Sequence, residues 1–192
     1  MKYSFVIITD NQEPDKLNRL IASIQAQKMD CEVLVSVDKD KTGRLGLLRN
    51  RGCRQAQGSI FIVLDDDMIL HDDFAAGIER LGDNWEVMSV RILNPDYTRF
   101  WDWKGYEKGL NWLMDYGDND PRVSLTGGFC ILRREVFDVV QWDETRGFYQ
   151  EEDVDFTQRL KQAGYFPVMN PYATVTHDAP YTQRGRGVFR ID

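Results

Sequence analysis

Apolar residues in the first half of the chain follow two alternating patterns. Short runs rich in β-branched and aromatic residues are typical of buried strands. They cover residues 3–9, 32–37, 60–64 and 87–92. Between these runs, apolar positions spaced three and four residues apart after Pro14 predict a helix, and two further helices are expected at 45–57 and 72–81. Strands and helices that alternate in this order predict an α/β domain with a mostly parallel, doubly wound central sheet flanked by helices.

The second half of the chain has a less regular pattern. We expect strands at 123–126, 129–132, 166–169 and 174–176, and helices at 107–115, 134–140 and 153–163. Seven aromatic residues lie between Tyr97 and Tyr116, and they suit either ordinary packing or a platform on which a sugar acceptor stacks. The Gly- and Arg-rich segment 181–192 is expected to be a flexible tail, and its arginines are candidates for a lid or for peripheral contact with an anionic membrane.

The composition limits the class of protein. The 192 residues include 42% apolar residues, enough for the core of one domain, and carry a formal net charge of −7. An acidic chain is a poor non-specific binder of nucleic acid. No apolar stretch approaches the roughly 20 residues of a transmembrane helix. Three cysteines without CxxC spacing argue against a zinc site or a disulfide framework, so we expect a reducing, cytoplasmic location.

An aspartate triplet, Asp65-Asp66-Asp67, directly follows the apolar run at 60–64. Three carboxylates at the end of a buried strand repel one another and lose hydration, so they need a counter-charge. A divalent cation supplies it and often takes a substrate's phosphates as further ligands. Because side chains alternate along a strand, we expect Asp66 to point away from Asp65 and Asp67. An acidic turn in water is the less favoured alternative, since ligands bind at the carboxyl ends of parallel strands.

Other polar residues also follow predicted strands. Thr9 and Asp38 each end such a strand, so they should line the same crevice, where they suit a base and a ribose. The alternative is structural: such residues can instead cap the helix that follows the strand. Arg49 and Arg51 lie on the second predicted helix, and one of them can face the crevice to neutralise a diphosphate or a carboxylate.

A second acidic cluster, Glu151-Glu152-Asp153-Val154-Asp155, opens a predicted helix. Acids stabilise a helix N-terminus, but a carboxylate here is also a candidate general base that accepts the proton of an attacking hydroxyl. His177 follows the last predicted strand, and a neutral imidazole can complete the shell of a divalent metal. The two acidic groups would then divide the work, one holding a metal and a leaving diphosphate and the other activating a nucleophile.

The order of these motifs resembles inverting nucleotide-sugar glycosyltransferases of the GT-A fold, and glycosyltransferase family two in particular. The resemblance extends from about Lys2 to His177. Its pieces are Thr9, Val37-Asp38, Leu48-Arg49-Asn50-Arg51-Gly52, the run that ends in Asp65-Asp66-Asp67, Thr126-Gly127-Gly128-Phe129, Glu152-Asp153-Val154-Asp155-Phe156, Ala163-Gly164-Tyr165 and Val175-Thr176-His177. A lone DxD pattern is weak evidence, whereas this ordered set is specific.

The resemblance implies a role for each candidate site residue. Contact with the sugar-nucleotide donor is implied for Thr9, Asp38, Arg49, Asp65, Asp66, Gly127 and Gly128. Asp67 and His177 would ligate the metal. Asp153 would be the catalytic base, with Glu152 as the alternative.

The resemblance also implies a reaction. A sugar would move from a nucleoside-diphosphate sugar, a UDP-sugar above all, to a hydroxyl of a saccharide or lipid-linked acceptor, with Mn²⁺ or Mg²⁺ as cofactor. One GT-A domain would divide into a nucleotide-sugar-binding half at 1–93 and an acceptor and catalytic half at 94–180. A retaining GT-A enzyme and an inactive sugar-nucleotide-binding module are the alternatives.

Overall fold

The apolar run at the start of the chain forms a central strand of the main β-sheet. In the computed structural model, which describes residues 1–118, 120–147 and 150–179, β1 (Tyr3–Thr9) pairs in parallel with β2 (Cys31–Val37) and with β3 (Ile60–Asp65). The connections are α1 (Pro14–Ala26) and α2 (Leu45–Gln55). This first βαβαβ unit confirms the order that the sequence predicts.

The rest of the main sheet is mixed in direction. In the described part of the chain its strand order is β2-β1-β3-β9-β5-β10-β4. The four further strands are β4 (Met68–Leu70), β5 (Val87–Leu93), β9 (Phe129–Arg133) and β10 (Val168–His177). β9 runs antiparallel between β3 and β5, whereas β10 pairs in parallel with β5. Strands from both halves of the sequence therefore build one sheet. The predicted α/β class is confirmed, but the sheet is mixed where the sequence predicts a mostly parallel one, since three of the six strand pairings among its described residues are antiparallel.

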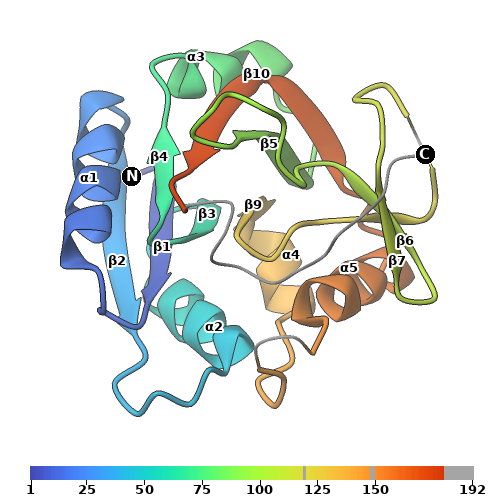
Figure 1. The fold of residues 1–192 in the computed structure, drawn as a ribbon, viewed down its shortest axis with the longest axis horizontal. Coiled ribbons are helices and arrows are strands. Elements are labelled where there is room, and N and C mark those ends of the chain that lie inside the picture. The colour runs from blue at the N-terminus through green and yellow to red at the C-terminus, as the bar shows by residue number, and fades with distance from the viewer. Residues whose placement is uncertain (119, 148–149, 180–192) are drawn as a thin grey trace.

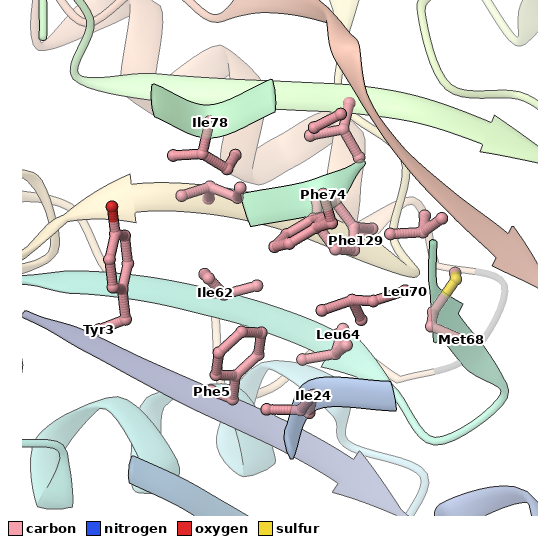
Figure 2. Packing of buried hydrophobic residues seen from close by; sticks show 14 of the residues in the cluster. Tyr3, Phe5, Ile24, Ile62, Leu64, Met68, Leu70, Phe74, Ile78 and Phe129 are labelled. Atoms are coloured by element: carbon pink, nitrogen blue, oxygen red, sulfur yellow. The ribbon is translucent and has the colours of Figure 1, made fainter. Parts of the chain in front are cut away.

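Alternating side chains of the strands bury the two faces of this sheet against different helices. Phe5 and Ile7 pack in a core with α1 and α3 (Phe74–Leu81), while Val6 packs in a second core with α2, α4 (Arg134–Val139) and α5 (Glu152–Gln162). Figure 1 shows the helices on either side of the sheet. Figure 2 shows the first core, where Phe5 and Ile62 lie near Phe74 and Phe129. No helix of the described residues is long and apolar enough to cross a membrane.

The predicted helix at 107–115 is wrong. That segment belongs to a hairpin of β6 (Lys104–Glu107) and β7 (Leu110–Leu113), which joins β8 (Val123–Ser124) in a small second sheet. Lys108 and Gly109 take positive φ values of 49° and 84° at the turn, as two-residue hairpins require, so the chain reverses there. Aromatic side chains that flank this turn pack across the small sheet and do not form a helical stripe.

Two smaller predictions about strands also differ from the structure. The separate strands expected at 166–169 and 174–176 form one strand, β10, whose register shifts between Asn170 and Thr174. The buried amide of Asn170 donates a hydrogen bond to Gly77 O (3.1 Å), which holds this bulge against α3. β4 has no counterpart among the predicted strands, and it adds an antiparallel edge directly after the aspartate triplet.

Candidate functional site

A cleft of about 650 Å³ lies at the carboxyl ends of β1, β2 and β3. Its lining includes all five residues that the sequence predicts at these strand ends: Thr9, Asp38, Asp65, Asp66 and Asp67. Ile8, Leu45 and Leu48 add apolar surface. The segment before α1 contributes Gln12 and Glu13, and α1 itself contributes Lys16. The cleft lies at the edge of the sheet where α/β proteins bind ligands.

The three aspartates do not alternate as the sequence analysis expects. β3 ends at Asp65, and the chain turns at Asp66 and Asp67 before β4 begins. Because strand alternation stops there, Asp66 does not point away from its neighbours: it lines the same cleft and accepts a hydrogen bond from the Thr9 hydroxyl. All three carboxylates therefore belong to one region of the molecule.

Asp38 also lines the cleft, but its carboxylate organises the following loop. Its Oδ1 accepts hydrogen bonds from Thr42 N (3.0 Å) and the Thr42 hydroxyl (3.1 Å), and its Oδ2 accepts one from Gly43 N (2.8 Å). Burial raises the pKa of Asp38, yet these hydrogen bonds outweigh burial and leave the pKa below its usual value. The loop role and the predicted contact with a nucleoside are compatible, since a carboxylate has further acceptor sites.

The helix α2 directs three consecutive polar side chains to three different places. Arg49 is only 2% exposed and faces the acidic groups. Asn50 pairs with the backbone of Trp142, donating to its carbonyl oxygen (2.9 Å) and accepting from its N–H (3.0 Å). Arg51 turns to β2, donating to Ser36 Oγ (3.1 Å) and Val37 O (2.6 Å). Of the two arginines that the sequence leaves open, Arg49 is the one beside the carboxylates.

Arg49 connects the two acidic groups. Its Nη2 lies 3.7 Å from Asp65 Oδ1 and donates to Gly127 O (2.6 Å), while its Nη1 donates to Glu152 Oε1 (3.3 Å). Burial lowers the pKa of the guanidinium, but Asp65 and Glu152 outweigh it and raise that pKa above its usual value. The guanidinium therefore stays charged in a buried position and holds the end of β3 and the start of α5 together.

Gly127 and Gly128 lie in the narrow space between these acidic groups. A Cβ on Gly127 would come within 2.8 Å of Glu152 Oε1, and one on Gly128 within 2.8 Å of Met68 Cε and 3.4 Å of Asp65 Oδ2. Neither glycine takes a positive φ, so the feature that the two positions share is the close approach of neighbouring side chains.

The acids at the start of α5 have different partners. Glu152 is 8% exposed and pairs with Arg49. Asp153 Oδ2 accepts a hydrogen bond from Lys104 Nζ (2.8 Å), and its Oδ1 accepts one from Val154 N (2.9 Å). Glu151 Oε1 accepts a hydrogen bond from the Tyr106 hydroxyl (2.8 Å). Glu152 therefore pairs with a residue of α2, while Asp153 and Glu151 are bound by residues of the small sheet.

Asp67 and His177 form the pair that suits a metal best. His177 Nε2 lies 3.4 Å from Asp67 Oδ2, and the residues are 7% and 1% exposed. Phe100 stacks on the imidazole, with ring centroids 4.4 Å apart. One carboxylate and one imidazole fit a divalent transition metal. The described residues contain no group of three or more His, Cys, Asp or Glu side chains that could hold such an ion, so substrate oxygens or water would complete its shell.

The remaining sequence-predicted features lie elsewhere. Trp103 is buried with Met114, Val123 and Met169 under the small sheet, so it packs and offers no stacking face. The tail arginines Arg184, Arg186 and Arg190 lie outside the described residues. Sequence reasoning did not single out Lys104, and it included Tyr106 only among the seven aromatic residues of the segment. No local motif marks their contacts, because these depend on how the hairpin packs against α5.

A family model decides the class of protein. The model for glycosyl transferase family 2 matches residues 5–140. The chain belongs to this family. It is a glycosyltransferase, as the order of its motifs predicts. The match ends before the acids of α5 and before His177, so the roles of these residues rest on the structure and on the sequence resemblance. No curated protein matches the chain.

Solved structures of glycosyltransferases have a similar fold. The catalytic domain of Drosophila β1,4-galactosyltransferase 7, in a complex with xylobiose, is 16% identical with a TM-score of 0.66, covering 98% of this chain and 75% of that one. GalNAc-T7 with UDP, GalNAc and Mn²⁺ is 15% identical with a TM-score of 0.69, covering 92% of this chain and 44% of that one. A mutant of the Drosophila enzyme with manganese, UDP-Gal and xylobiose is 16% identical with a TM-score of 0.63, covering 99% and 76%. These likenesses confirm the GT-A fold.

We expect Arg49→Met to lower the free energy of unfolding by about 3–5 kcal/mol, because it leaves Asp65 and Glu152 without their buried counter-charge. Chemical denaturation followed by circular dichroism measures this change. Arg51→Met is the matched control from the same helix. It removes hydrogen bonds from an exposed side chain and should cost about 1 kcal/mol or less. Equal losses in the two variants would contradict the central role of Arg49.

Proposed function

We propose that this glycosyltransferase moves a sugar from a nucleoside-diphosphate sugar to an acceptor hydroxyl, with inversion at the anomeric carbon and with Mn²⁺ or Mg²⁺ as cofactor. One observation carries the proposal: Arg49 holds two separate acidic groups on either side of Gly127 and Gly128. One group lines a cleft suited to a nucleotide, and the other opens toward a second sheet. The Drosophila enzyme with manganese, UDP-Gal and xylobiose supports a UDP-sugar donor and a saccharide acceptor by analogy.

The donor would occupy the cleft at the strand ends. Thr9 and Asp38 would face the nucleoside, and Asp65 and Asp66 would lie near the ribose. Lys16 also lines this cleft, and its ammonium offers a positive charge to an anionic ligand. Gly128 lies close to the Asp65 carboxylate, so its backbone would lie beside the sugar-bearing end of the donor.

The metal would be held by Asp67 and His177. Such a cation supplies positive charge that stabilises a leaving diphosphate. His177 is kept in place by the stacked ring of Phe100. The segment that follows is tied to the aspartate turn, since Asp178 N donates to Asp67 O (2.6 Å). The two ligands therefore sit on elements that are directly linked to each other.

Asp153 would act as the general base. Glu152 is the alternative in sequence, but it is bound to the buried Arg49, whereas Asp153 faces the acceptor side. Asp153 would take the proton of the acceptor hydroxyl as its oxygen bonds to the anomeric carbon. The bond from that carbon to the diphosphate oxygen breaks, and its electron pair leaves with the diphosphate. Attack from the face opposite the leaving group inverts the configuration.

The three cysteines support a cytoplasmic location of the protein. Cys31, Cys53 and Cys130 are all unpaired, as in a reducing compartment such as the cytoplasm. Burial raises the pKa of Cys130 to about 12, so this thiol is chemically inert. A lipid-linked acceptor, with peripheral membrane contact, is the alternative to a free saccharide.

Replacement of the base tests the catalytic assignment. We expect Asp153→Asn to lower kcat by about 10²–10⁴-fold, because the amide cannot accept the proton, while the Kd for UDP with Mn²⁺ stays unchanged. Steady-state kinetics and calorimetry measure the two quantities. Asp155→Asn, on the same helix but paired with Arg159 and Arg146, is the control and should keep wild-type kcat. If Glu152→Gln abolishes transfer and Asp153→Asn does not, Glu152 is the base.

Calorimetry tests the metal site. Mn²⁺ should strengthen the binding of UDP to the wild type, and Asp67→Ala should remove this Mn²⁺-dependent gain because one of the two ligands is lost. UDP titrations with and without Mn²⁺ measure the gain. Asp72→Ala, an exposed acid outside the cleft, is the control. An unchanged gain in Asp67→Ala would exclude Asp67 as a ligand.

The anomeric configuration of the first product separates inversion from retention. Proton NMR of the product, recorded before it can isomerise, should show the configuration opposite to that of the donor. Retention would leave the glycosyltransferase assignment intact but would remove Asp153 from the role of base for an inverting attack. An inactive binding module would neither transfer the sugar nor hydrolyse the sugar nucleotide slowly in the presence of Mn²⁺.

A further inference from the structure

Two cations separate the adjacent carboxylates at the start of α5. Arg49, from the helix that follows β2, pairs with Glu152 at 3.3 Å, and Lys104, from the small sheet, pairs with Asp153 at 2.8 Å. The two ion pairs lie close together, because Glu152, Asp153 and Arg49 all approach Gly127. The position of a Cβ on Gly127 would lie 2.8 Å from Glu152 Oε1, 3.7 Å from Asp153 Cβ and 3.8 Å from Arg49 Nη2. Asp153 thus lies near a buried guanidinium with which it does not pair.

Lys104 reaches Asp153 from a strand that has a second contact with the same helix. Side chains two residues apart on a strand share one face, and Tyr106 donates its hydroxyl hydrogen to Glu151 at 2.8 Å. The side chains of Lys104 and Asp153 are 12% and 16% exposed, so the pair is shielded from most water yet remains open to a ligand. Figure 1 shows the hairpin of β6 and β7 beside α5.

We propose that Lys104 is a positioning residue for sugar transfer, which rests on the proposed role of Asp153 as the base. Lys104 holds the Asp153 carboxylate toward the acceptor side, while Val154 N–H binds the other oxygen. A carboxylate accepts about four hydrogen bonds, so an acceptor hydroxyl can still donate to it. Without the lysine, the strongest nearby attraction for Asp153 is the Arg49 guanidinium on the donor side.

The position needs a cationic donor and not lysine as such. An arginine can donate to the same carboxylate, whereas a methionine has similar length but neither charge nor donor. A carboxylate that turns away from the acceptor hydroxyl loses the geometry of proton transfer, and a misplacement of about 1 Å can cost about 100-fold in rate. The loss should therefore appear in kcat and should not appear in the binding of the nucleotide.

Three variants test the proposal: Lys104→Met, Lys104→Arg and Tyr106→Phe. Activity is measured with a panel of UDP-sugars and p-nitrophenyl glycosides, using the best wild-type pair, and nucleotide binding is measured with UDP and Mn²⁺. We expect Lys104→Met to lower kcat by about 10- to 100-fold, with the Kd for UDP and the melting temperature unchanged. Lys104→Arg should restore most of the kcat. Tyr106→Phe, which removes the neighbouring contact on the same strand face, should leave kcat at the wild-type value.

Asp153→Asn in the same assay separates the two proposals. Wild-type kcat in Lys104→Met, with Asp153→Asn inactive, would overturn the role of Lys104 and leave the base in place. An arginine variant as slow as the methionine variant would overturn it as well, since any cationic donor should suffice. Wild-type kcat in Asp153→Asn would overturn the assignment of the base. Crystal structures give a second readout that needs no substrate: the Asp153 carboxylate should turn toward Arg49 in Lys104→Met and should stay beside position 104 in Lys104→Arg.

Discussion

The buried guanidinium of Arg49 is the interaction on which the site depends. It touches Asp65 at the end of β3, the carbonyl oxygen of Gly127 and Glu152 at the start of α5. A charge with 2% exposure is stable only because these partners replace the water it has lost. The same contacts draw three distant parts of the chain into one place. Arg49 is therefore both a structural residue and the link between the two sides of the site.

This arrangement separates the acids into two groups with different partners. The carboxylates of the aspartate triplet lie at the cleft, where β3 ends and the chain turns toward β4. Those of α5 lie beyond Gly127, where Arg49 binds one and Lys104 binds the next. A glycosyltransferase needs such a division, because a departing diphosphate must be stabilised while an acceptor hydroxyl loses its proton. Gly127 and Gly128 lie between the two groups, close to Glu152 and to Asp65.

Sequence reasoning succeeded where a residue's place follows from local pattern. Thr9, Asp38 and the triplet were predicted at one crevice, because the carboxyl ends of parallel strands meet at one edge of a sheet. It failed at the hairpin of β6 and β7. A turn with positive φ at Lys108 and Gly109 reverses the chain there, and the aromatic residues hide the alternation of apolar and polar positions that is typical of strands. The predicted orientation of Asp66 was also wrong, because β3 ends at Asp65 and the alternation of side chains stops there.

The sequence by itself determined the family, the α/β class and the meeting of the strand-end acids at one cleft, because periodicity and ordered motifs are properties of neighbouring residues. Only the tertiary structure decided which cation meets which acid. Arg49 and Arg51 look alike in sequence, and the turn of α2 sends one inward and the other to β2. Lys104 has no motif at all, and its contact with Asp153 exists because the small sheet packs against α5. Such pairings depend on how elements far apart in the chain pack together, so they cannot be predicted from the local sequence.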